Sequence, residues 1–148
     1  TLFPEARLQK TLEVRGADSV PAGYSAALPA LWLAVLYDDE CLTAFESRLV
    51  PFGHDAWQAA RPNIVEEGLA ARIGDTTVGA LARELLPLVD KALARRARTN
   101  DQGQDERVYL APLHECAADD RSIGDLVLGG WVPSQPDALA SLLERAAY

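Results

Sequence analysis

The chain has 148 residues, 49% apolar and 24% charged, which is typical of a globular protein that can bury one core. Fourteen basic residues against twenty-two acidic ones give a net charge of −8, so nucleic acid is not expected as a partner. No apolar run approaches the roughly 20 residues that a membrane-spanning helix requires, so a membrane protein is not expected either.

Cysteine and histidine usage predicts neither disulfides nor a metal centre. Cys41 and Cys116 are too few for a disulfide scaffold and lack a paired metal-binding spacing, so we expect free thiols and a cytoplasmic location. His54 and His114 have no ligand partner at a metal spacing, and we expect neither to act in catalysis. The chain begins at Thr1 without an initiator methionine or a leader, which indicates a piece of a longer protein.

Residues 8–17 predict a short strand followed by a turn. Leu12 and Val14 alternate with Glu13 and Arg15, which is the period of two of a half-buried strand. Because side chains two positions apart on a strand share a face, we expect Glu13 and Arg15 to point the same way.

The remainder of the chain, residues 25–148, predicts a helical region. Residues 26–37 are almost wholly apolar and too long for a buried strand, which favours a buried helix. Asp38 and Asp39 then precede an amphipathic stretch at 42–49, and carboxylates stabilise the positive amino terminus of a helix. We expect these two helices to pack as a pair.

The clearest helical pattern follows Thr76 or Thr77, either of which can cap it. Residues 54–61 predict a further helix that Pro62 should end or kink. Three more helices are predicted at residues 108–118, 123–128 and 137–147. The fold class that follows is mainly α: a helical bundle with one or two short amino-terminal strands, in a single domain over residues 1–148.

The first 18 residues read TLFPEARLQKTLEVRGAD. This segment resembles the glutamate-cysteine ligases (gamma-glutamylcysteine synthetases) of the plant and proteobacterial type, whose pattern runs close to TLFPEVRLKxYLExRGAD. The likeness continues in residues 27–39, ALPALWLAVLYDD, in residues 94–97 and 109–113, and in the terminal Tyr148. It covers nearly the whole chain and is similar to the carboxyl-terminal part of such a ligase.

The resemblance implies ATP-dependent joining of the glutamate γ-carboxylate to the cysteine amine through γ-glutamyl phosphate, the first step of glutathione synthesis. Magnesium is the implied cofactor and ATP the implied co-substrate. The short strands would complete the sheet of a larger α+β ligase domain, with residues 1–18 as the active-site strand segment. The missing upstream part of the same ligase would supply the rest of the site, so we expect the isolated chain to be inactive.

The family pattern also implies roles for particular residues. Its Glu-x-Arg strand looks like a metal-ligand glutamate followed by an arginine that contacts substrate or phosphate, which makes Glu13 the metal ligand and Arg15 the catalytic, substrate-binding residue. Magnesium prefers carboxylate oxygen, and phosphoryl transfer needs a cation to hold developing charge. Arg7 is a weaker substrate-binding candidate, and Asp18 is a candidate to orient Arg15. An ordinary surface ion pair between Glu13 and Arg15 is the alternative.

The sequence departs from the family pattern directly after Asp18. Residues 19–24, SVPAGY, replace the usual Gly-Gly-Pro-Trp and remove a bulky aromatic residue. Two further functions therefore stay open. One is a non-catalytic helical interaction or regulatory module derived from the ligase, and the other is a related carboxylate-amine ligase that uses another amine acceptor.

Overall fold

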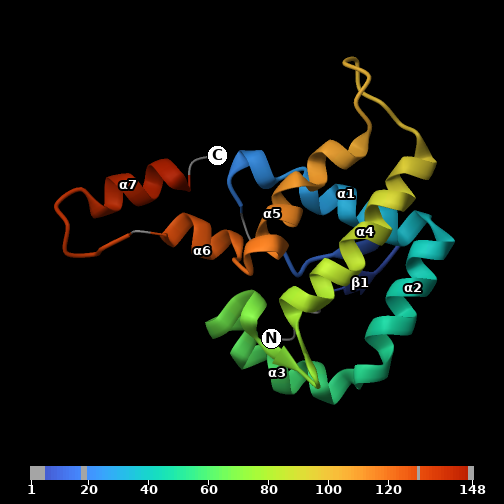
Figure 1. Cartoon of the computed structure of the whole chain (residues 1–148), viewed down its shortest axis with the longest axis horizontal. Helices are drawn as coiled ribbons and strands as arrows, with labels where there is room; N and C mark the ends of the chain where they lie inside the picture. The colour runs from blue at the N-terminus through green and yellow to red at the C-terminus, as the bar shows by residue number, and fades with distance from the viewer. Residues whose placement is uncertain (1–5, 18–19, 130, 147–148) are drawn as a thin grey trace.

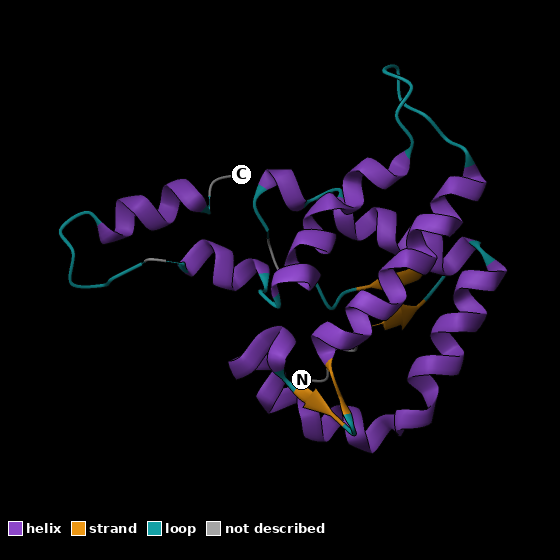
Figure 2. Cartoon of the chain, in the orientation of Figure 1, coloured by secondary structure: helices purple, strands orange, loops and turns teal. Residues whose placement is uncertain are grey.

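The computed structural model describes residues 6–17, 20–129 and 131–146 and is mainly helical, as predicted, with two small antiparallel sheets (Figures 1 and 2). The helices are α1 (Ala27–Tyr37), α2 (Asp39–Leu49), α3 (Gly53–Glu67), α4 (Val78–Arg96), α5 (Ala111–Asp119), α6 (Ile123–Leu128) and α7 (Ala138–Arg145). The strands are β1 (Ala6–Leu8), β2 (Leu12–Val14), β3 (Arg72–Ile73) and β4 (Thr76–Thr77). Short 3-10 turns are η1 (Ala22–Tyr24), η2 (Val50–Phe52), η3 (Gly68–Ala70) and η4 (Glu106–Leu110).

Helix α4 forms the centre of the main core. Its residues Val89, Ala92 and Leu93 are completely buried, because a spacing of three and four places them on one face of the helix. This face packs against α1 and α2, which also contact each other as the sequence predicted. Leu110, at the end of η4, fills the same cluster. Within the described residues, no helix is both long enough and apolar enough to cross a membrane.

Asp38 joins the start of α2 to the end of α4. Its Oδ1 accepts a hydrogen bond from the backbone N–H of Cys41 at 2.9 Å, which caps α2 as the acidic pair predicted. Its carboxylate also accepts from Nε and Nη2 of Arg95 at 2.8 and 2.5 Å. Arg96 pairs in turn with Glu106 at 3.0 Å. These arginines of the basic segment at the end of α4 therefore serve the fold.

Pro62 was expected either to end or to kink its helix. It lies inside α3, so the expected end at Pro62 is wrong. Proline removes one backbone hydrogen-bond donor from the helix, which destabilises it. The packing of Ala60 and Ile64 of α3 into a second core cluster with Ile73 offsets this loss. The helix ends instead at Gly68, whose φ of 56° suits glycine. The β3–β4 pair that follows was not predicted, because two-residue strands carry no readable alternation.

The carboxyl-terminal helices α6 and α7 lie to one side of the bundle in Figure 1. The Trp131 indole N–H donates to the carbonyl of Ala138 at 3.0 Å, which fixes the start of α7. Arg145 donates to the Ser141 hydroxyl at 2.9 Å. Helix α7 lies within the predicted range 137–147, and it exposes Leu139 to solvent.

Cys41 and Cys116 are buried free thiols, and burial raises the pKa of both. A raised pKa leaves little reactive thiolate at neutral pH. We expect the native protein to react with Ellman's reagent at pH 8 at least about tenfold more slowly than the unfolded protein. Unfolding without reductant should release two reactive thiols per chain, and a lower number would contradict this assignment.

Candidate functional site

The strands β1 and β2 form a hairpin whose register sorts its side chains by polarity. Arg7 lies opposite Glu13, while Leu8 lies opposite Leu12. Opposed residues share a face of the sheet, and residues two apart on a strand do as well. Arg7, Glu13 and Arg15 therefore occupy one face, as expected for the last two, and the apolar residues occupy the other.

The Glu13 carboxylate lies between two guanidinium groups. Nε and Nη2 of Arg7 donate to its Oε2 at 2.8 and 2.5 Å, and Nε of Arg15 lies 3.5 Å from its Oε1. The three side chains are 42%, 43% and 31% exposed in the order Arg7, Glu13, Arg15. They are accessible to an incoming ligand while they hold one another in place.

The structure thus brings together three of the four candidate residues. Arg7, the weaker candidate on sequence grounds, makes the shorter contact with Glu13. Asp18 lies outside the described residues. The metal-binding and substrate-binding roles of these residues stay predictions, because two exposed ion pairs around one carboxylate also occur on ordinary surfaces.

The hairpin is a basic segment of an acidic protein. Residues 6–15 hold Arg7, Lys10 and Arg15 against Glu13, a charge of +2, whereas the whole chain carries −8. Guanidinium groups bind phosphate and carboxylate through paired hydrogen bonds, so this face suits an anionic ligand. The local charge favours an approaching anion that the rest of the surface repels.

The polar face of the hairpin could supply only one of the carboxylate ligands of a magnesium ion. Magnesium usually keeps several waters and is bound through one or two carboxylates together with substrate phosphates. Glu13 offers one such carboxylate. Elsewhere in the part of the chain that the structure describes, no three His, Cys, Asp or Glu side chains are grouped to hold a metal. Glu13 alone would therefore leave most positions around a magnesium ion to waters or to other ligands.

An apolar cavity of about 540 Å³ separates the other face of the hairpin from α1. Leu12 and Val14 form one wall, and Leu28, Trp32 and Leu36 of α1 form the other. The indole N–H of Trp32 is buried and has no hydrogen-bond partner within the described residues. Trp32 lies in the apolar stretch at residues 26–37 for which the sequence predicted a buried helix, but that pattern gave no signal for this unsatisfied donor.

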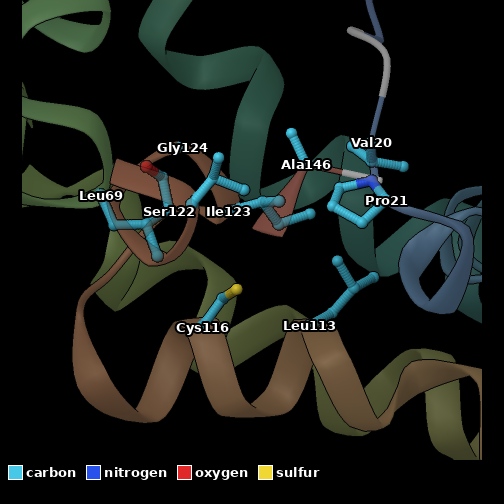
Figure 3. A pocket seen from close by; sticks show the side chains of 10 residues that line it. Val20, Pro21, Leu69, Leu113, Cys116, Ser122, Ile123, Gly124 and Ala146 are labelled. Carbon is cyan, nitrogen blue, oxygen red and sulfur yellow. The ribbon is translucent and has the colours of Figure 1, made fainter. Parts of the chain in front are cut away.

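A second cavity, of about 560 Å³, lies between α5, α6 and the segment after the hairpin (Figure 3). Val20 and Pro21 of the altered segment line it, together with Cys116 and Ile123. The Ser122 hydroxyl on its wall is already bonded to Asp125 in the cap of α6. This cavity offers an apolar lining and no group prepared for proton or phosphoryl transfer.

Two polar residues of the helical region, His114 and Asp120, have structural partners. His114 Nε2 lies 2.9 Å from Asp90 Oδ2, which links α5 to α4. Asp120 accepts from Arg83 Nη1 at 2.5 Å and joins the same helices at their other end. Neither pair lies on the hairpin, so neither adds a proton donor or a metal ligand to the candidate site.

Comparison with curated proteins finds plant ligases. The chain is 38% identical over 96 residues to glutamate–cysteine ligase A, chloroplastic, of Oryza sativa subsp. indica, which covers 65% of this chain and 20% of the relative. It is 35% identical to glutamate–cysteine ligase, chloroplastic, of Arabidopsis thaliana, over 65% of this chain and 18% of the relative. The chain therefore spans about a fifth of the length of these relatives. No solved structure matches it.

The predicted cytoplasmic location is wrong on this comparison, because these relatives are all named chloroplastic. The prediction depended on two unpaired cysteines. Free thiols report on the redox state of a compartment and do not distinguish one reducing compartment from another.

A family model described as glutamate-cysteine ligase family 2 matches residues 1–126. The matched region includes the hairpin with Arg7, Glu13 and Arg15 as well as the helices α1 to α5. It ends within α6, so α7 lies beyond it. The match covers well over half of the sequence, and the chain belongs to glutamate-cysteine ligase family 2.

Proposed function

We propose that this chain supplies one part of the active site of an ATP-dependent ligase that joins the glutamate γ-carboxylate to the cysteine amine. The proposal is supported by the hairpin of this chain, on which the Glu13 carboxylate lies between the guanidinium groups of Arg7 and Arg15. The chain belongs to glutamate-cysteine ligase family 2. In the reaction, the γ-carboxylate attacks the γ-phosphorus of ATP and releases ADP. The cysteine amine then attacks the γ-glutamyl phosphate, loses a proton and releases phosphate.

The hairpin residues have separate tasks in this proposal. Magnesium, when bound with ATP, neutralises charge on the phosphate oxygens. Glu13 offers it one carboxylate oxygen, and Arg15 holds negative charge that develops on the transferring phosphoryl group. Arg7 binds an anionic group of the substrates and, in their absence, the Glu13 carboxylate. Asp18 remains a proposed partner that orients Arg15.

The proposed site is shared with other parts of the ligase. The hairpin offers one carboxylate and no group that would bind the nucleotide base, and the relatives are about five times as long as the region they share with this chain. We therefore propose that residues 1–148 form a single carboxyl-terminal domain. On this proposal, the isolated chain does not turn over.

The test is ADP release from magnesium-ATP in the presence of glutamate and cysteine. The natural polypeptide isolated from its source is compared with the 148-residue chain. Turnover by a longer polypeptide alone supports a shared site. Turnover by the short chain alone refutes the shared site, and no turnover by either favours the non-catalytic module.

One observation favours the alternative in which the ligase uses another amine in place of cysteine. The segment that replaces the family's Gly-Gly-Pro-Trp places Val20 and Pro21 on the wall of an apolar cavity. A change in the segment that directly follows the hairpin supports a different acceptor amine. Replacing cysteine by a panel of amines in the ADP assay separates the two, since the true acceptor gives the highest kcat/KM.

A further inference from the structure

Both hydrogen bonds from Arg7 end on the same oxygen of Glu13. Nε and Nη2 of Arg7 donate to Oε2 at 2.8 and 2.5 Å, whereas Oε1 has a longer contact of 3.5 Å with Nε of Arg15. The strongest contacts of a guanidinium group place two parallel N–H donors on two different oxygens. The contact of Arg7 with Glu13 lacks this geometry. A phosphate or carboxylate that presents two oxygens therefore offers Arg7 a better matched partner than Glu13.

The same contact obstructs the approach of a cation to Glu13. Its Oε2 already accepts two hydrogen bonds, and guanidinium nitrogens lie within 3.5 Å of both of its oxygens. Arginine side chains do not lose their proton in proteins, so both positive charges are permanent. Like charges about 4 Å apart repel each other strongly where water is partly excluded. A divalent cation is therefore repelled for as long as Arg7 remains on the Glu13 carboxylate.

An exchange of partners requires the rotation of side chains alone. Arg7 and Glu13 lie opposite each other in the register of β1 and β2, so the hairpin holds their backbones while both side chains extend from its polar face. The two side chains are 42% and 43% exposed. Ion pairs exposed to this degree contribute little to stability, because solvent screens them and two long side chains must be ordered. An incoming ligand can therefore replace the contact easily.

We propose that the Arg7–Glu13 contact couples the two ligands of this face, so that an anion and a divalent cation bind cooperatively. An anionic group with two oxygens, a phosphate or a carboxylate, takes Arg7 away from Glu13, and the freed Oε2 becomes available to the cation. The coupling is reciprocal, because each ligand removes the competitor of the other. The face accordingly binds a cation together with an anion in preference to the cation alone. The identity of these ligands rests on the proposed function, whereas the contact itself does not.

The first test follows the Glu13 carboxyl carbon by NMR in the 148-residue chain without metal. Glu13→Gln assigns the signal, and Arg7→Gln gives its position when Arg7 makes no contact. Pyrophosphate and glutamate are added in separate titrations. The parent signal should move towards the Arg7→Gln position, and the signal of Arg7→Gln should stay in place. The anion that acts at the lower concentration is identified as the partner of Arg7. Sodium chloride at the same ionic strength is the control, because chloride screens charge without offering two oxygens.

The second test measures the binding of Mn²⁺ to the natural ligase without nucleotide, by electron paramagnetic resonance. The binding that Glu13→Gln removes is assigned to Glu13. Arg7→Gln should strengthen this binding at least about threefold, because the competing guanidinium is gone. Lys10→Gln is the matched control. Lys10 is an exposed cation between β1 and β2 of the same hairpin, and its replacement removes the same charge and should change the affinity less than twofold.

Three results would overturn the coupling. They are a Glu13 signal that neither anion moves, a signal that moves without approaching the Arg7→Gln position, and an Mn²⁺ affinity that Arg7→Gln and Lys10→Gln raise equally. The third would mean that charge alone explains the change. Mn²⁺ binding that does not depend on Glu13 would overturn the coupling and the proposed metal ligand together.

The NMR test does not depend on the proposed catalysis. A ligase that needs Glu13 for ADP release but shows an unmoved Glu13 signal would retain its proposed function without the coupling. A signal that moves as expected, in a ligase whose ADP release survives Glu13→Gln, would support the exchange of partners and refute the catalytic role of this face.

Discussion

Replacing Glu13 by glutamine in the complete ligase is expected to lower kcat about a thousandfold or more while leaving the fold intact. The substitution removes the negative charge that the proposed metal requires, but it keeps the size of the side chain and one hydrogen-bond acceptor for Arg7. Because Glu13 is 43% exposed, it contributes little to the core. Steady-state ADP release and thermal unfolding measure the two effects separately.

Glu84→Gln is the matched control for this change. Glu84 also pairs with an arginine, since its Oε2 lies 2.8 Å from Nε of Arg48, but it lies on α4 and not on the hairpin. Its replacement should leave kcat within about twofold of the parent value, because it removes a surface ion pair alone. A Glu13→Gln ligase that keeps a tenth or more of the parental kcat would show that Glu13 is not a metal ligand.

The sequence predicted what depends on neighbouring residues. The alternation at residues 12–15 located β2 and the shared face of Glu13 and Arg15. Thr76 or Thr77 was expected to cap the long helix, and Asp38 and Asp39 were expected to stabilise the start of the helix after them. Thr77 and Asp38 accept hydrogen bonds from the first turn of α4 and α2. Each of these features is set within about four residues along the chain, so periodicity and capping preferences were enough.

Three features that depend on contacts between distant residues were not predicted. The pairing of Arg7 with Glu13 requires the register of the hairpin, and a shift by one residue would have placed Arg7 on the apolar face. The contact of Arg95 with Asp38 joins residues 57 positions apart. Among the described residues the Trp32 N–H has no acceptor, which depends on what surrounds its ring in three dimensions and is encoded by no local pattern.

The helices and the hairpin differ in how much of their surface is buried. Helix α4 and the helices packed on it contain most of the completely buried side chains and the Asp38–Arg95 contact, whereas the hairpin contains the polar cluster and little buried surface. The helical core therefore has most of the buried contacts, and the hairpin depends on few of them. The charged face of the hairpin is accessible in this arrangement.

The stability of the helical core should depend on Asp38. Asp38→Ala is expected to lower the free energy of unfolding at pH 7 by roughly 1–2 kcal/mol, because it removes the cap of α2 and leaves Arg95 without its bidentate partner. Asp39→Ala is the control. Asp39 lies in the first turn of α2 and is exposed, so its loss should cost at most about 0.5 kcal/mol. Urea unfolding of the three proteins measures the difference.

The effect of Asp38 should also depend on pH in a defined direction. The hydrogen bond from Arg95, followed by that from Cys41, lowers the pKa of Asp38 from 3.8 to about 2. A carboxylate with a lowered pKa in the folded state stabilises the protein fully above its unfolded pKa and loses this contribution as the pH falls through the folded value. The gap between wild type and Asp38→Ala should therefore be constant from pH 7 to 5 and shrink between about pH 4 and pH 2. Asp38→Asn, which keeps a capping oxygen without the charge, should lie between the two proteins at pH 7 and should approach wild type in acid. A gap that widened as the pH fell would refute the ionised Asp38–Arg95 contact as its source.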